Sequence, residues 1–229
     1  MLSINERIKT RYGKESAGNC SLGCGSNLEY LRLHTGERVL DLGCGAGSET
    51  IQAAVLVGDE GEAVGLDLTP EMLDMARRNA LEKGFGNTSF LSGTIEQLPF
   101  EDKNFDAILS NCVINHAPDK KKVYQEIFRV LKTGGRFVVS DAVSKEDLPD
   151  YIKNDPDQWA ACFGGAITEE KYLECIREAG FADIDIVSRR EYLKNGYDFA
   201  SLTICAVKPS EIIVGEVKSD ETCKQEKPL

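Results

Sequence analysis

A nine-residue segment, VLDLGCGAG (Val39–Gly47), constrains the fold more than any other part of the sequence. A short aliphatic run leads through Asp41 into three glycines at alternate positions, and a helical pattern then begins. Glycines permit a tight turn between strand and helix, and they allow a ligand to approach the backbone closely. The segment therefore predicts a strand, a glycine loop and a helix that together border a ligand site.

Strand and helix patterns alternate at regular intervals up to residue 140. Strands are predicted at 38–42, 63–68, 88–92, 106–110 and 136–140, and helices at 48–57, 70–83 and 120–131. Thr69 is the expected N-cap of the second helix, with Pro70 in its first turn, and Gly134–Gly135 are expected to end the third. This rhythm predicts a parallel sheet with helices on both faces.

The pattern changes after residue 140. Residues 141–167 are irregular, a helix is predicted at 169–179 behind Thr168 as N-cap, and strands are predicted at 182–188 and 201–208. We expect an N-terminal segment with a cysteine loop at 1–35 and a main domain at 36–209, with a substrate-side insertion at 142–167. A C-terminal tail is expected at 210–229.

Charge and hydropathy exclude several classes of protein. The 229-residue chain carries 27 basic and 38 acidic residues, a net charge of −11, with no cluster of basic residues. Nucleic-acid binding needs a positive face, so we expect no nucleic-acid partner. No apolar run approaches the roughly 18 residues of a membrane helix, and the N-terminus lacks an apolar signal core. An acidic cytoplasmic protein is the expectation.

Asp67 lies twenty residues beyond the glycine loop, at the end of the second predicted strand. A carboxylate there can accept hydrogen bonds from both hydroxyls of a ribose. The acid at Asp41 favours a ligand with cationic groups over a pyrophosphate, which prefers backbone N–H groups. A tight turn without a ligand is the competing interpretation, and the correct placement of Asp67 weakens it.

Eight cysteines are many for a chain of this size in a reducing compartment, where metal, catalytic or buried thiols are more common than disulfides. Four have ordinary explanations in a strand, a helix, the glycine loop and the polar tail: Cys112, Cys175, Cys44 and Cys223. The other four are candidates for chemistry: Cys20, Cys24, Cys162 and Cys205. No second cysteine or histidine pair accompanies Cys20 and Cys24 to complete a zinc site.

Three segments resemble class I S-adenosylmethionine-dependent methyltransferases: VLDLGCGAG, GLDLTPEMLDMARRNA at 65–80, and residues 91–141 with their LKTGGR turn. The resemblance implies a Rossmann-like, doubly wound, mostly parallel seven-stranded sheet with an antiparallel last strand. It also implies S-adenosyl-L-methionine as cofactor. The residues that it places around the cofactor are Asp41, Gly43, Gly45, Gly47, Asp67, Leu68, Thr69, Met72, Thr94, Ile95, Glu96, Asn111, Cys112 and Val113. Thr94 stands where the family often has an aspartate, which weakens the expected contact with the adenine amino group.

A narrower resemblance concerns SNCVINHAPDK at 110–120 and CFGGAITEEKYLECIREAGF at 162–181, which are similar to segments of arsenite methyltransferases. It implies that trivalent arsenic is the substrate, held by the thiolates of Cys24 and Cys162, with Cys20 or Cys205 assisting. An external thiol reductant of the thioredoxin or glutathione type would then be a partner. Cys205 also reads as a core residue of the last strand.

The chemistry agrees, because arsenic(III) is soft and thiophilic and its lone pair is the nucleophile, so no general base is needed. Two alternatives remain open. One is methyl transfer to a small organic acceptor of the quinone, sterol or amine type, with His116 as base. The other is a non-catalytic, cysteine-rich metal-binding or sensing protein. His116 stands where the arsenite family often has an apolar residue, and His34 is expected to be a surface or structural residue.

Overall fold

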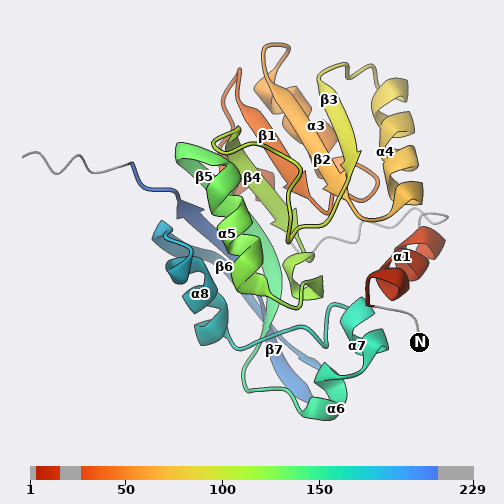
Figure 1. Ribbon diagram of the computed structural model, residues 1–229, viewed down its shortest axis with the longest axis vertical. Coiled ribbons are helices and arrows are strands. Elements are labelled where there is room, and N and C mark those ends of the chain that lie inside the picture. The colour runs from red at the N-terminus through yellow and green to blue at the C-terminus, as the bar shows by residue number, and fades with distance from the viewer. Residues whose placement is uncertain (1–3, 16–26, 211–229) are drawn as a thin grey trace, which may run out of the picture.

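A computed structural model describes residues 4–15 and 27–210 of the chain (Figure 1). The strands are β1 (Arg38–Leu42), β2 (Glu62–Asp67), β3 (Thr88–Ser92), β4 (Phe105–Asn111), β5 (Leu131–Ser144), β6 (Ala182–Lys194) and β7 (Tyr197–Val207). They form one seven-stranded sheet in the order β3-β2-β1-β4-β5-β7-β6. The first five are parallel, and β7 is antiparallel to both of its neighbours. The predicted Rossmann-like fold is confirmed.

The helices are α1 (Ile4–Glu15), α2 (Asn27–Leu31), α3 (Ser48–Val57), α4 (Pro70–Glu82), the 3₁₀ helix η1 (Ile114–His116), α5 (Lys120–Val130), α6 (Asp150–Lys153), α7 (Pro156–Ala160) and α8 (Glu169–Glu178). Four helices lie where the sequence pattern predicts them: α3, α4, α5 and α8. Two short helices, α6 and α7, lie in the segment expected to be irregular, and three were not predicted: α1, α2 and η1. Thr69 and Thr168 are N-caps as predicted, although only the Thr168 hydroxyl accepts a backbone N–H.

The sheet carries a separate apolar cluster on each face because successive strand residues point to opposite sides. In β4, Ile108 packs into the cluster with α5 and α8, whereas its neighbours Ala107 and Leu109 pack into the cluster with α2 and α3. Figure 1 shows α5 and α8 in front of the sheet. Helices therefore cover both faces of the sheet.

The structure corrects the prediction at the double glycine. We expected Gly134–Gly135 to end a helix at residue 131 and a strand to begin at 136, but α5 ends at Val130 and β5 begins at Leu131. Gly134 has a φ of +77°, and its N–H donates to the carbonyl of Lys208. The backbone of the glycine pair is thus held by the end of β7, with a shift in the register between β4 and β5.

The segment at 142–167 packs as a small satellite core. Leu148, Ile152 and Phe163 are buried against Phe199 of β7. This cluster lies beyond the carboxyl ends of the parallel strands, next to α1, which packs on α7 and α4 (Figure 1).

The order of the sheet reverses between β1 and β4, and ligands of open α/β sheets bind outside the carboxyl ends at such a switch point.

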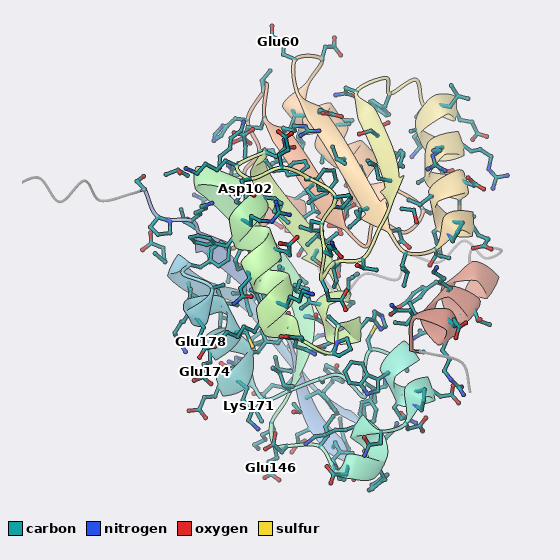
Figure 2. The ribbon with its side chains drawn as sticks, in the orientation of Figure 1. Glu60, Asp102, Glu146, Lys171, Glu174 and Glu178 are labelled. Carbon is teal, nitrogen blue, oxygen red and sulfur yellow. The ribbon has the colours of Figure 1, made fainter. Side chains whose placement is uncertain are left out.

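The outer surface is acidic. Figure 2 shows Glu60, Asp102, Glu146, Glu174 and Glu178 at the periphery of the fold, and all five are exposed. Some form surface ion pairs, such as Glu178 with Lys121 at 2.8 Å. None of the helices in the described ranges is long and apolar enough to cross a membrane.

Candidate active site

The glycine loop between β1 and α3 has the form that the sequence predicts. Gly43, Gly45 and Gly47 have φ values of +71°, +51° and +80°, which side chains rarely adopt. A Cβ at Gly43 would lie 2.2 Å from Val113, and one at Gly47 would lie 2.9 Å from Ala76. No atom of the described residues lies within 4 Å of the corresponding position at Gly45. Two of the glycines therefore allow close packing, and the middle one leaves open space for a ligand.

Asp67 closes this loop from the end of β2. Its Oδ2 accepts the N–H of Gly45 at 2.9 Å, and its Oδ1 accepts the N–H of Thr69 at 2.8 Å. Burial raises the pKa of Asp67, and the two backbone N–H groups partly offset that rise. Each carboxylate oxygen retains a lone pair, so the side chain can also accept hydroxyls of a ribose.

Two further carboxylates stand beneath the loop. Asp41 is fully buried and accepts a 2.6 Å hydrogen bond from the hydroxyl of Thr50. Glu49 accepts hydrogen bonds from the side-chain amide of Asn111 at 3.1 Å and from the N–H of Asn27 at 3.4 Å. Burial, with the nearby charge of Glu49, raises the pKa of Asp41 to about 8. A cationic ligand would relieve this concentration of negative charge.

Sequence reasoning missed Glu49. The sequence signal for it is its position in the first turn of the helix after the glycine loop. From there Glu49 contacts Asn111 at the carboxyl end of β4.

The residues expected to border the adenosine follow the ends of β2 and β3. Thr69 and Met72 are buried at the start of α4, and Leu68 is half-buried beside them. Thr94 forms a backbone bridge with Gln97, and Ile95 between them is buried. Glu96 lies in the same bridge turn, and the N–H of Gly93 just before it donates to the carbonyl of Asp67 at 3.1 Å, which ties this turn to the end of β2.

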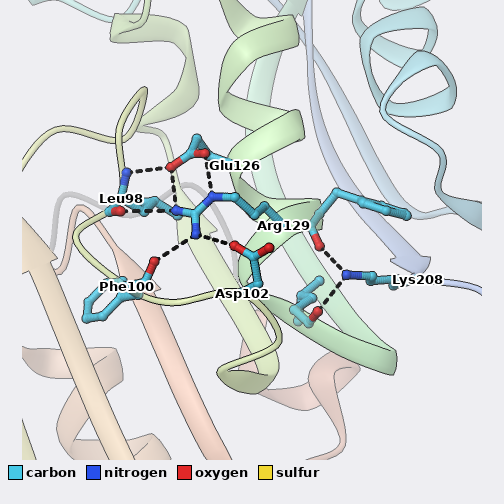
Figure 3. A network of polar contacts seen from close by, with 8 residues as sticks. Leu98, Phe100, Asp102, Glu126, Arg129 and Lys208 are labelled. Carbon is cyan, nitrogen blue, oxygen red and sulfur yellow. Dashed lines mark hydrogen bonds and ion pairs between the residues drawn. The ribbon is translucent and has the colours of Figure 1, made fainter.

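Arg129 of α5 holds the segment at 98–102, which follows the Thr94–Gln97 turn. Its guanidinium donates to the carbonyls of Leu98 and Phe100, and it pairs with Glu126 and Asp102 (Figure 3). Glu126 in turn accepts the N–H of Leu98 at 2.7 Å. The five residues of this network lie in α5 or in the segment at 98–102, so the network holds that segment against the helix.

The end of β4 joins the glycine loop to the cysteine region. Asn111 bonds Glu49, Val113 packs on Gly43, and the N–H of Cys112 donates to the carbonyl of Ser140 in β5. Cys112 is buried with a φ of +60°. This backbone leads directly into η1, which carries His116.

Cys162 lies against that same backbone. Its thiol donates to the carbonyl of Cys112 at 3.3 Å, and its Sγ lies 3.0 Å from Nε2 of His116. The hydroxyl of Tyr12 lies 3.5 Å from Sγ of Cys162 and 3.2 Å from Nε2 of His116. Burial raises the pKa of Cys162 to about 11 and lowers that of His116 to about 4, so both groups are neutral near pH 7. Sequence reasoning had placed Cys112 beside the cofactor only.

Cys162 is positioned by the close approach of two backbone segments, the one after α7 and the one that contains η1. A Cβ at Gly165 would lie 1.9 Å from the carbonyl oxygen of Asn115, and one at Gly164 would lie 2.8 Å from the backbone nitrogen of Trp159. Asn115 is itself anchored, because its N–H donates to the buried carboxylate of Asp141 at 3.0 Å. The glycine pair therefore lets the segment after α7 pack onto η1.

The structure separates the remaining candidate residues. Cys205 lies in the middle of β7 opposite Val138 and packs against the core cluster of α2 and α3, so it is not brought to Cys162. His34 is exposed, and its N–H donates to Glu37. Cys20 and Cys24 lie outside the described residues. Within the described ranges, no group of three or more histidine, cysteine or acidic side chains is arranged to hold a metal ion.

Comparison with known proteins assigns this arrangement to a family. Residues 33–180 match a family described as a methyltransferase domain. The chain belongs to the methyltransferase domain family. A solved arsenic(III) S-adenosylmethionine methyltransferase from Chlamydomonas reinhardtii superposes with a TM-score of 0.72 at 30% identity, over 90% of this chain and 74% of that one.

Curated members of the family include several arsenite methyltransferases. That of Halobacterium salinarum is 40% identical over 170 residues, which cover 74% of this chain and 44% of the relative. The human enzyme is 35% identical over 195 residues, which cover 81% of this chain and 49% of the relative. The chain thus spans about half the length of these relatives. A demethylmenaquinone methyltransferase from Lactococcus lactis is 32% identical over 182 residues, which cover 71% of this chain and 70% of that one.

S-adenosylmethionine is the cofactor that membership of the family implies, and the site fits it. The open space beside Gly45 gives it access to the backbone, and Asp67 can take the ribose. The carboxylates of Asp41 and Glu49 suit a molecule with an ammonium and a sulfonium group.

Proposed function

We propose that this methyltransferase transfers a methyl group to trivalent arsenic held by the thiolates of Cys24 and Cys162. The observation that carries the proposal is the position of Cys162, whose thiol lies against the backbone of Cys112 where β4 leaves the cofactor side of the site. The arsenite methyltransferases among the relatives support the same acceptor.

The residues of the chain have three tasks in this reaction. The first is to bind the methyl donor, for which the glycine loop and Asp67 are arranged. The second is to hold arsenic through soft sulfur ligands, which such a centre prefers to oxygen or nitrogen. The third is to bring arsenic in line with the methyl group and exclude water, since a displacement at carbon depends mainly on position. S-adenosylmethionine supplies the activated methyl group when it is bound.

Each thiol changes its bonding partner during substrate capture. The Cys162 thiol is protonated near neutral pH, so its proton leaves with a hydroxide or thiolate displaced from arsenic, as water or a free thiol. The arsenic lone pair is the nucleophile, and no side chain has to remove a proton in the methyl-transfer step. Methyl transfer breaks the S–CH₃ bond, forms an As–CH₃ bond and leaves arsenic at the pentavalent level. External thiols of the glutathione or thioredoxin type then supply two electrons, are oxidised to a disulfide and return arsenic to the trivalent state.

The deciding experiment measures methylated arsenic formed from arsenite and S-adenosylmethionine in the presence of a thiol. Cys162→Ser and Cys24→Ser are each expected to lose at least 90% of the rate, on the order of the loss expected when a substrate-positioning group is removed. Both should retain affinity for S-adenosylhomocysteine. Cys175→Ser is the matched control, because Cys175 is a half-buried thiol of α8 outside the site.

A quinone acceptor is the second candidate, favoured by the similarity to the demethylmenaquinone methyltransferase over 70% of that protein. Demethylmenaquinone is therefore run beside arsenite in the same assay. Turnover of the quinone with equal rates for the parent and the two cysteine variants would overturn the arsenite proposal. A protein that fails to bind S-adenosylhomocysteine would instead support a metal-binding or sensing role.

A further inference from the structure

Three polar side chains from distant parts of the chain meet at one point. Tyr12 comes from α1, His116 from η1, and Cys162 from the segment after α7. The three interatomic distances are 3.0 Å for Sγ to Nε2, 3.2 Å for the tyrosine hydroxyl to Nε2, and 3.5 Å for the hydroxyl to Sγ. Sequence reasoning considered His116 as a base, as a structural or cofactor-edge residue, or as a change that alters the size or polarity of the substrate, and it gave Tyr12 no role at Cys162.

The tautomer of His116 follows from its other nitrogen. Nδ1 lies 3.1 Å from the carbonyl oxygen of Trp159, which can only accept a hydrogen bond. Nδ1 therefore carries the proton in the neutral ring, and Nε2 is left as an acceptor. Because Trp159 also accepts the N–H of Cys162, one carbonyl fixes both the ring and the cysteine backbone.

We propose that Nε2 of His116 and the hydroxyl of Tyr12 bind a hydroxyl group on trivalent arsenic, so that the site selects inorganic arsenite over an already methylated arsenical. This inference rests on the proposed function. It assigns a task to two residues that the binding of arsenic by thiols does not require.

The selectivity follows from the number of exchangeable groups on arsenic. Arsenous acid, As(OH)₃, exchanges two hydroxyls for two thiols, releases two waters and keeps one hydroxyl. Methylarsonous acid, CH₃As(OH)₂, undergoes the same two exchanges and keeps none. The oxidation state of arsenic does not change in either case. Only inorganic arsenite therefore presents an O–H that Nε2 can accept and an oxygen to which Tyr12 can donate.

Nε2 of His116 and the hydroxyl of Tyr12 are positioned to bind the hydroxyl that arsenic retains. An arsenic atom bonded to Sγ of Cys162 lies next to both of them, because they surround that sulfur at 3.0 and 3.5 Å. An apolar side chain in place of His116 would leave the hydroxyl without this acceptor, and an unpaired buried polar group is costly. The competing interpretation is that the contacts among the three side chains only dock α1 onto the domain.

Matched substitutions separate these interpretations. His116→Asn retains an amide donor toward the Trp159 carbonyl and loses the acceptor at Nε2, whereas His116→Gln extends a carbonyl oxygen toward the Nε2 position. Tyr12→Phe removes only the hydroxyl. Tyr151→Phe is the control, since its hydroxyl contacts Tyr197 on the exposed surface.

The readout is the affinity for arsenous acid and for methylarsonous acid, each added without other thiols and followed by the fluorescence of Trp159, the one tryptophan in the sequence. Loss of one hydrogen bond is expected to weaken arsenite binding about fivefold to tenfold in His116→Asn and Tyr12→Phe. Methylarsonous acid should bind these variants as it binds the parent. The preference is the ratio of the dissociation constants for methylarsonous acid and arsenous acid. His116→Gln should restore at least half of the logarithm of this ratio, and Tyr151→Phe should retain the full ratio.

The outcomes distinguish this inference from the function on which it rests. Equal changes for both arsenicals, or none, in His116→Asn and Tyr12→Phe would overturn the hydroxyl subsite. Arsenite binding that is unaffected by Cys162→Ser would overturn the proposed function itself. Thermal melting and affinity for S-adenosylhomocysteine, measured on every variant, identify any change caused by misfolding.

Discussion

Nε2 of His116 lies 3.0 Å from Sγ of Cys162, although 46 positions separate the two residues in the chain. The contact joins the end of the parallel sheet to the insertion that covers it. Its geometry depends on the packing of the Gly164–Gly165 pair against η1 and Trp159.

Gly165→Ala should separate the two side chains. The added Cβ would lie 1.9 Å from the backbone oxygen of Asn115, so one of the two segments must move. Such overpacking typically costs about 1–3 kcal/mol of unfolding free energy. We expect this loss in urea unfolding, together with weaker arsenite binding and unchanged affinity for S-adenosylhomocysteine. Gly86→Ala is the control, because no atom in the described part of the chain lies within 4 Å of its Cβ position. Equal stability of the two variants would contradict the prediction.

Asp41→Asn should change how stability depends on pH. In the folded protein the pKa of Asp41 is raised from 3.8 to about 8, so between these values folding takes up a proton. Stability without cofactor therefore falls as pH rises from about 4 to 8, and an asparagine removes this contribution. We expect the variant to lose less stability than the parent between pH 5 and pH 8.5 in denaturant titrations. An unchanged slope, equal to that of the exposed control Asp59→Asn, would refute the assignment.

The same carboxylate should couple protons to cofactor binding. A cationic ligand favours the ionised form of Asp41, so its proton is released when S-adenosylmethionine binds. Affinity should therefore weaken as pH falls from 8 to 6. Calorimetry in two buffers of different ionisation enthalpy measures the proton release directly, and Asp41→Asn should reduce it.

Arg129→Met should loosen the segment at 98–102, which follows the residues expected to border the adenosine. It removes the hydrogen bonds to the carbonyls of Leu98 and Phe100 and leaves Glu126 without its cation. We expect a loss of about 1–3 kcal/mol in unfolding free energy and a severalfold weaker affinity for S-adenosylhomocysteine. Lys121→Met removes an exposed ion pair with Glu178 and should change neither quantity measurably. Unaltered cofactor affinity in Arg129→Met would show that the network does not act on the site.

Asn27→Ala should weaken the attachment of α2 to the sheet. The buried Asn27 donates to the carbonyl of Ser110 at 2.8 Å and accepts the hydroxyl of Ser140 at 2.5 Å. The alanine leaves these buried partners in β4 and β5 with fewer bonds, which typically costs about 1–3 kcal/mol. Thermal unfolding should show the loss, and the exposed control Asn5→Ala should match the parent.

The features predicted correctly are those that the local sequence determines. The glycine loop, β1, α3 and β3 have the predicted bounds because the glycines, the aliphatic runs and the helical periodicity lie in adjacent residues. Alternation also predicted the last two strands, whereas the antiparallel direction of the final strand came from the resemblance to methyltransferases, because periodicity does not give direction.

The features that were missed depend on contacts between distant residues. β5 begins five residues earlier than predicted because its partners, Phe105 and the end of β7, hold Leu131 and the glycine pair in the sheet. Tyr12 reaches Cys162 through the packing of α1 on α7, and no pattern in either segment encodes that contact. Spacing along the chain likewise left Cys205 among the candidates until its place in β7 was known.

The position of β7 sets the order in which the molecule can be completed during synthesis. The five parallel strands and their helices are finished by residue 144, but the place between β5 and β6 is taken by β7, which is synthesised after the other six strands of the sheet. Until residue 207 has left the ribosome, β5 presents an unpaired edge and β6 has no partner. The satellite core that contains Phe163 also cannot be completed until Phe199 of β7 has been synthesised. The nascent chain therefore gains the surface around Cys162 only after its cofactor-binding half has had time to fold.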